Sequence, residues 1–216
     1  MPRPAPPAIL PALLLAAVLA VVPGLPAAAG TTPPPPVALE LMLAVDGSAS
    51  ISTGALEFEL RGHAAAFRDP AVVAAIEAGG GIAVTLAAFS GPHTLKVLVP
   101  WTEVRDAAAA EAFAVRVLAA PRAFKADSTA LGSAIDAAAA LFDTNAIVAP
   151  RKAIDIVSNG FSNAGGDPAA ARDRAAARDI TVNALAILDE YPWLEEYYRE
   201  SVIGGFNAFV ETAMDR

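Results

Sequence analysis

Short apolar runs alternate with segments of helical periodicity from residue 37 onward. The first run, 39–45, is apolar at every position except Glu40. Such a run is typical of a strand covered on both faces, because a strand with one face in water alternates apolar and polar residues. The same reasoning predicts strands at 82–89, 153–158 and 181–188. Amphipathic periodicity predicts helices at 57–67, 107–119, 130–142 and 168–178, and three glycines at 79–81 end one more.

Residues 94–101 are a further predicted strand, which begins only a short turn after the strand at 82–89. A parallel neighbour needs a crossover of about a dozen residues, so this strand is predicted to be antiparallel and at an edge. A last short strand is predicted at 208–212. The pattern therefore predicts an α/β fold: a doubly wound, mostly parallel sheet with one antiparallel edge strand. Such sheets bind ligands at the carboxyl ends of their strands.

Residues 1–29 predict a secretory signal peptide. Arg3 is the only charged side chain before an apolar run at 9–22, which prolines and then three alanines at 27–29 follow. The run is shorter than the roughly 20 residues of a membrane-spanning helix, although an uncleaved anchor is the alternative. Residues 30–36, with four consecutive prolines, predict a stiff linker, and 37–216 a single domain. We expect an exported protein, periplasmic or secreted, with no membrane span after signal cleavage.

Composition narrows the classes of function. The chain contains no cysteine, which excludes disulfides, thiolate metal sites and a lipid-bearing thiol. Its 15 Lys and Arg against 23 Asp and Glu give a net charge of −8. We therefore expect no nucleic-acid partner, because phosphate backbones are bound by basic surfaces.

Candidate chemistry begins where the first predicted strand ends, at Asp46, Ser48 and Ser50. Alternate positions of an extended turn project to the same side. Three oxygen donors that converge there suit Mg²⁺ or Mn²⁺, which prefer octahedral oxygen shells. The alternative is an ordinary turn whose serine caps the following helix.

Two further polar turns follow the same logic. Asp127 and Ser128 precede the helix at 130–142, where they are predicted helix N-caps. The strand at 153–158 ends in Ser158-Asn159-Gly160. Three polar turns on one rim of one sheet favour a common site over three unrelated turns.

The chain resembles von Willebrand factor type A domains, and the resemblance covers residues 37–212. It rests on the Asp-x-Ser-x-Ser of the first turn, a Thr that opens a mid-chain helix, and a later strand followed by a polar Gly turn. Further segments resemble a bacterial exported family known only as domain of unknown function eleven-ninety-four; they include Arg68-Asp69-Pro70 and Tyr197-Tyr198.

The resemblance implies a metal-ion-dependent adhesion site. Its ligand positions fall on Asp46, Ser48, Ser50, Thr129 and Asn159. It also implies Mg²⁺ or Mn²⁺ as cofactor, and as partner a protein that presents an acidic residue to the metal. The family's third-loop Asp is Asn159 here, which removes a negative charge and weakens the expected binding. The resembling proteins also continue into a final helix, whereas this sequence stops at Arg216, so one sheet face is expected to be partly bare.

We expect a binding module and no enzyme. The alternative is a metal-free scaffold that binds its partner through the rim surface. A hydrolase is a distant third: Ser162 lies in an elbow-like Gly-x-Ser-x-Ala turn after a strand, but His63 and His93 both precede it. Trp193, Tyr197 and Tyr198 are interpreted as packing residues, with a binding surface as the alternative.

Overall fold

The computed structural model describes residues 35–121 and 126–214. The strands in these residues are β1 (Leu39–Asp46), β2 (Ile82–Phe89), β3 (Leu95–Val104), β4 (Arg151–Ser158), β5 (Ile180–Ile187) and β6 (Val210–Ala213). The helices are α1 (Thr53–Ala66), α2 (Pro70–Ala78), α3 (Ala107–Leu118), α4 (Leu131–Leu141), α5 (Pro168–Ala176) and α6 (Leu194–Ser201).

The strands form one sheet in the order β3-β2-β1-β4-β5-β6. Among the strands of the described residues, only the β2–β3 pair is antiparallel, and β3 lies at an edge. The doubly wound, mostly parallel sheet predicted from the sequence is thereby confirmed, together with its antiparallel edge strand. The chain leaves β1 toward β2 on one side and returns through β4 on the other. The winding therefore reverses between β1 and β4, the place where such sheets open a crevice at their carboxyl ends.

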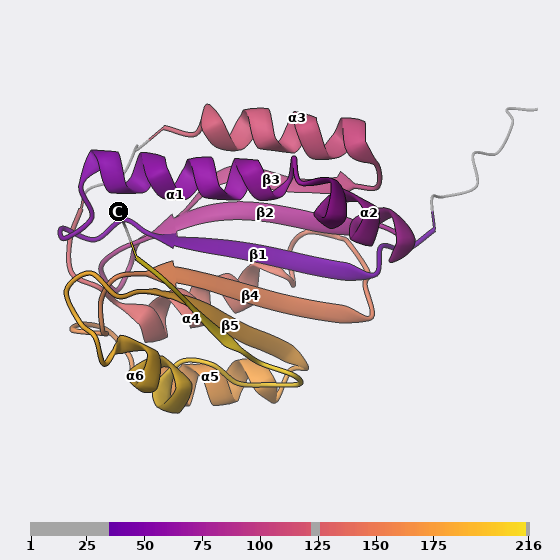
Figure 1. The fold of residues 1–216 in the computed structure, drawn as a ribbon. Helices are drawn as coiled ribbons and strands as arrows, with labels where there is room; N and C mark the ends of the chain where they lie inside the picture. Colours follow the sequence, from indigo (N-terminus) through magenta and orange to yellow (C-terminus); the bar gives the residue numbers. More distant parts are fainter. Residues whose placement is uncertain (1–34, 122–125, 215–216) are drawn as a thin grey trace, which may run out of the picture. The chain divides into compact units, whose positions relative to one another are not determined.

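Helices cover both faces of the sheet in a three-layer arrangement (Figure 1). Helices α1, α2 and α3 lie on one face, where Leu86, Phe113 and Val117 are buried. Helices α4, α5 and α6 lie on the other face, over Ile154 and Ile156 of β4. Alternate residues of the central strands thus enter two separate cores, and this explains why those strands are almost entirely apolar.

Local signals set most helix starts. The side chain of Asp69 accepts hydrogen bonds at the start of α2, and Asp167 does the same for α5. Both helices begin with Pro, whose missing N–H is not needed in the first turn. Ser52 caps α1 by accepting a hydrogen bond from the Ala55 N–H at 3.0 Å.

Helix α6 was not predicted. It has only eight residues, and Trp193 before it makes no side-chain capping hydrogen bond. It is amphipathic, however, and it buries Leu194 and Tyr198, four residues apart on one face. The predicted signal peptide at 1–29 and most of the predicted linker lie outside the described residues. Within the described residues, no helix is long and apolar enough to cross a membrane.

Candidate functional site

The loop after β1 folds its polar groups inward. Asp46 is fully buried, and its Oδ1 accepts a hydrogen bond from the Ser48 N–H at 2.7 Å. The hydroxyls of Ser48 and Ser50 lie 3.1 Å apart. Neither serine caps α1, because Ser52 does. The serine that caps α1 in this turn is therefore Ser52, while Ser48 and Ser50 contact other groups of the rim.

The loop after β4 joins this loop directly. Ser50 donates a hydrogen bond to Asn159 Oδ1 at 3.3 Å. Ser158 donates to Asp46 Oδ2 at 2.6 Å. The structure thus brings Asp46, Ser48, Ser50 and Asn159 into one hydrogen-bonded group at the carboxyl ends of β1 and β4, where the winding of the sheet reverses.

Thr129 lies against the same loops. It is 4% exposed, and a Cβ placed on Gly160 would lie 3.6 Å from its Oγ1. The Ala49 N–H donates to the Asp127 carbonyl oxygen at 2.7 Å, which ties the first loop to the segment before α4. Each of the five residues predicted as ligands therefore lies at this rim.

The predicted N-caps of α4 were wrong. The cap position is Ala130, which offers no side-chain hydrogen bond. Side chains of the loop after β4 accept hydrogen bonds from this helix start instead. Ser162 Oγ accepts from the Leu131 N–H at 3.2 Å, and Asn163 Oδ1 accepts from the Thr129 N–H at 2.9 Å. The start of α4 is therefore held by the loop after β4. Ser162 thus holds the first turn of α4.

A shallow hollow of about 430 Å³ opens above these loops. Its lining includes Ser48, Ser50, Thr129, Asn163 and Asp127. The Asp127 carboxylate leans toward Gly91, because a Cβ on that glycine would lie 3.1 Å from its Oδ2. The hollow therefore offers hydroxyl, amide and carboxylate oxygens to a ligand from solvent.

Two residues support the site through contacts that the sequence did not predict. Ser158 binds Asp46, and Tyr198 Oη donates to the Gly160 carbonyl oxygen at 2.7 Å. Burial raises the pKa of Tyr198 well above its usual range, and the nearby Asp46 charge acts in the same direction. Tyr198 therefore stays a donor at every physiological pH. It comes from α6, far along the chain, so only the fold places it here.

The oxygen groups fit a hard divalent cation by type. Hydroxyls, an amide oxygen and a carboxylate are the ligands that Mg²⁺ and Mn²⁺ take. Among residues 35–121 and 126–214, no three His, Cys, Asp or Glu side chains cluster as a metal site. The fit therefore rests on neutral oxygens around a single buried carboxylate, a set of low charge.

The family model described as "Protein of unknown function (DUF1194)" matches residues 36–216. The chain belongs to this family. No curated protein matches the sequence. The description of this family assigns no activity to its members.

Solved structures similar to this DUF1194 chain contain von Willebrand type A-like domains. Proximal thread matrix protein 1 from the mussel byssus superposes with a TM-score of 0.60 at 14% identity, over 83% of this chain and 44% of its own. The pilus adhesin SpaC from Lactobacillus rhamnosus GG gives 0.57 at 14%, over 82% and 28%. The SpRpn10 VWA domain gives 0.55 at 12%, over 83% and 90%.

The DUF1194 chain spans less than half the length of the mussel and pilus proteins. Identities this low establish the fold alone, so the domain is von Willebrand type A-like in architecture. One structure of the mussel protein is described as having a zinc-occupied MIDAS motif; it superposes with a TM-score of 0.55 at 18% identity, over 70% of this chain and 38% of its own.

Proposed function

We propose that this domain is an exported binding module that holds a divalent cation at the rim and captures a protein partner through it. The observation that supports the proposal is the hydrogen-bonded group of Asp46, Ser48, Ser50 and Asn159 at the reversal of the sheet. A cation bound there would offer an open coordination position to an acidic side chain of the partner.

Each residue has its own part in this proposal. Ser48, Ser50 and Thr129 supply hydroxyl oxygens, and Asn159 supplies a neutral amide oxygen. Both oxygens of Asp46 already accept hydrogen bonds, from the Ser48 N–H and the Ser158 hydroxyl. A carboxylate oxygen has two lone pairs, so Asp46 can still orient a water on the cation while it supplies the compensating charge.

The low charge of the site predicts weak affinity. Asp46 is the one carboxylate in the hydrogen-bonded group. Asp127, in the segment before α4, lines the hollow above the rim loops. Cation affinity rises with the number of negative ligands. We therefore expect the site to bind Mg²⁺ or Mn²⁺ weakly, so that it is occupied only when the concentration of free cation around the protein is high.

A second candidate is a metal-free scaffold that binds its partner through the rim surface. The observation that favours it is that the side chains of Ser48, Ser50 and Asn159 are already hydrogen-bonded to one another in this structure. In that case, the hollow itself would be the contact surface. Neither candidate requires bond cleavage, and Ser162 donates only to backbone oxygens, at 3.3 and 3.5 Å.

Calorimetric titration of the purified protein with Mg²⁺ and Mn²⁺ tests the proposal. Ser50→Ala is the sharpest variant, because Ser50 is exposed and its loss leaves the core intact. We expect saturable heat with the native protein and at least a fivefold weaker affinity with Ser50→Ala. Ser201→Ala, on α6, is the matched control and should bind as the native protein does. Titrations without heat would favour the metal-free scaffold.

A further inference from the structure

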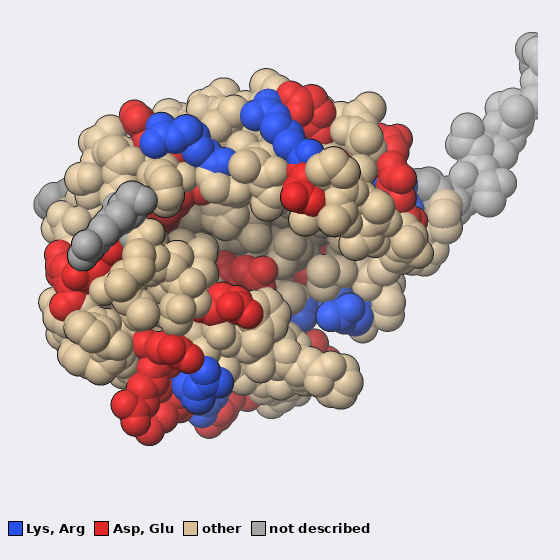
Figure 2. Space-filling view, in the orientation of Figure 1, with Lys and Arg blue, Asp and Glu red and all other residues tan. Residues whose placement is uncertain are grey.

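Little charge of either sign lines the hollow above the rim loops. Among its described lining residues there is no Lys or Arg, and Asp127 is the one acidic residue. The chain around it is acidic, and acidic side chains outnumber basic ones on the face drawn in Figure 2. A further carboxylate at the rim would therefore meet no basic side chain in this hollow. Its charge would be left for a cation, whose affinity rises with the number of charged ligands.

Asn159 is the one asparagine of the sequence that precedes a glycine. The other four each precede an alanine: Asn145, Asn163, Asn183 and Asn207. The backbone nitrogen of the next residue attacks an asparagine side chain most readily when that residue is glycine, because glycine has no Cβ to obstruct ring closure and its backbone is the least restricted. The Asn159–Gly160 pair is therefore the place in this chain where we expect such a reaction.

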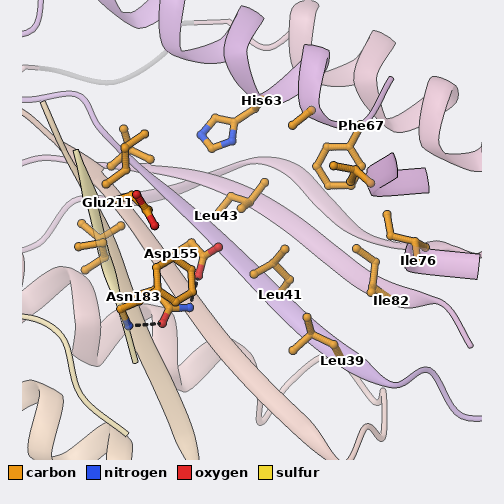
Figure 3. A pocket seen from close by; sticks show the side chains of 17 residues that line it. Leu39, Leu41, Leu43, His63, Phe67, Ile76, Ile82, Asp155, Asn183 and Glu211 are labelled. Atoms are coloured by element: carbon orange, nitrogen blue, oxygen red, sulfur yellow. Dashed lines mark hydrogen bonds between the residues drawn. The ribbon is translucent and has the colours of Figure 1, made fainter. Parts of the chain in front are cut away.

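The backbone nitrogen of Gly160 is not held by the sheet. Strand β4 ends at Ser158, and the Gly160 N–H donates to the Ser158 hydroxyl oxygen at 3.1 Å. Asn183, in β5, shows the opposite case. The N–H that follows it donates to the Phe209 carbonyl oxygen, and its side-chain amide donates to Asp155 (Figure 3). The Gly160 nitrogen can therefore leave its partner without disrupting the sheet.

Neighbouring groups prepare both reacting atoms. Ser50 donates to Asn159 Oδ1 at 3.3 Å, so a hydroxyl lies where negative charge develops when the side-chain carbonyl is attacked. On the other side, Ser158 accepts from the Gly160 N–H and donates to Asp46 Oδ2 at 2.6 Å. A proton that leaves the nitrogen thus has a path through the Ser158 hydroxyl to a carboxylate.

We propose that Asn159 is a site of spontaneous deamidation, and that the aspartate it forms is the charged state of the rim. The Gly160 nitrogen attacks Asn159 Cγ and closes a succinimide ring, while its proton passes to Asp46. The side-chain nitrogen leaves as ammonia and takes that proton with it. Water then adds at Cγ and opens the ring, which restores the backbone and leaves a carboxylate. In sum, one amide and one water become one carboxylate and one ammonium ion.

The fold favours aspartate over isoaspartate as the product. Ring opening at the backbone carbonyl would route the chain through the side chain and lengthen it by a methylene group. The chain is fixed on both sides of this bond, because Ser158 ends β4 and the Gly160 carbonyl oxygen accepts from Tyr198 Oη at 2.7 Å. A longer chain would break one of these contacts. The deamidation does not depend on the proposed function, whereas the effect of the new charge on cation binding rests on it.

Peptide mapping by mass spectrometry tests the reaction. The purified protein is incubated at physiological pH and temperature, and the amide and acid forms at each asparagine are measured over time. We expect Asn159 to convert at least about tenfold faster than any asparagine that precedes alanine, which corresponds to a barrier lower by about 1.4 kcal/mol. Equal rates at all the asparagines, or no conversion at Asn159, would overturn the proposal.

Two variants assign the rate to these contacts. Gly160→Ala has room for its Cβ, since the nearest non-adjacent atom, Thr129 Oγ1, would lie 3.6 Å away, and it should slow conversion about tenfold. Ser50→Ala removes the donor to Asn159 Oδ1 and should slow conversion about threefold, less than in a buried oxyanion site. Ser201→Ala, on α6, is the matched control and should convert as the native protein does. Conversion of Ser50→Ala at the native rate would overturn the part given to the rim contacts.

The converted protein carries one more negative charge, so anion exchange separates it from the native protein. Calorimetric titration with Mg²⁺ then compares both with Asn159→Asp. We expect the converted protein and Asn159→Asp to bind alike, each about tenfold more tightly than the native protein. Tighter binding by Asn159→Asp alone would indicate an isoaspartate product and overturn the charged state proposed for the rim. If Asn159→Asp binds no more tightly either, the cation site and the charged rim fail together, and the mass measurements alone decide the deamidation.

Discussion

Ser158, at the end of β4, donates a 2.6 Å hydrogen bond to Asp46 Oδ2, at the end of the neighbouring strand β1. The other oxygen of Asp46 accepts from the Ser48 N–H. The two bonds fix the one buried carboxylate of the rim in a single orientation. They also explain how a charged side chain is tolerated there, since a buried charge must be hydrogen-bonded.

Ser158→Ala should therefore destabilise the protein. Removal of the hydroxyl leaves a buried, charged acceptor without one of its donors, which costs about 1–3 kcal/mol. Urea unfolding measures the change. Ser201→Ala, at the end of α6, should stay within about 0.5 kcal/mol of the native protein. Equal stability of Ser158→Ala and the native protein would show that this bond does not hold Asp46.

Tyr198→Phe tests the support from α6. The variant keeps the ring in the core but removes the donor to the Gly160 carbonyl oxygen. We expect a loss of about 1 kcal/mol, the usual net value of one buried hydrogen bond. Tyr191→Phe also removes a tyrosine hydroxyl, but from a partly buried ring, and should leave the midpoint of thermal unfolding unchanged. A larger loss from Tyr191→Phe would contradict this assignment.

Much of the fold could be predicted because the central strands are apolar on both faces, as in 82–89, and because Asp69-Pro70 and Asp167-Pro168 mark helix starts. Helix α6 was missed because it has no capping residue and is short. Its packing, not its propensity, places Tyr198 in the core.

The candidate site could be predicted only in part. The spacing of Asp46, Ser48 and Ser50 is a local pattern, so it is visible in one loop. The capping of α4 by Ser162 and Asn163 joins residues more than 30 positions apart. A single sequence contains no signal for such a contact, and the predicted caps at Asp127 and Ser128 were therefore wrong.

His63 should make stability depend on pH. Its pKa is about 4 in the folded protein and 6.5 in the unfolded chain. Between these values, the unfolded chain binds a proton that the folded protein does not, so stability falls as pH drops from 6.5 to 4. The loss should reach about 3 kcal/mol at most. Urea unfolding of the native protein and His63→Gln over this range isolates the contribution; parallel curves would contradict it.

Asp155→Asn should stabilise the protein at neutral pH. Burial raises the pKa of this carboxyl, and the hydrogen bond from Asn183 opposes the shift only in part. The folded state then carries an unfavourable charge above that pKa, whereas below pH 3.8 both states are protonated. We expect a gain on the order of 1 kcal/mol at pH 7 that disappears at low pH. Glu200→Gln is the control, and a variant less stable than the native protein at pH 7 would contradict the argument.

The most direct test of the cation site is thermal unfolding of the native protein and Asn159→Asp, each with excess Mg²⁺ and with chelator. Asn159→Asp restores a charge beside Ser50 and should tighten Mg²⁺ binding by about tenfold, or about 1.4 kcal/mol. Because the cation binds only the folded state, the variant should gain stability with Mg²⁺ and none with chelator. Asn207→Asp, an exposed change outside the rim, should show no metal-dependent gain. Midpoints that Mg²⁺ raises in neither protein would contradict the cation site, and equal increases in both would place Asn159 outside it.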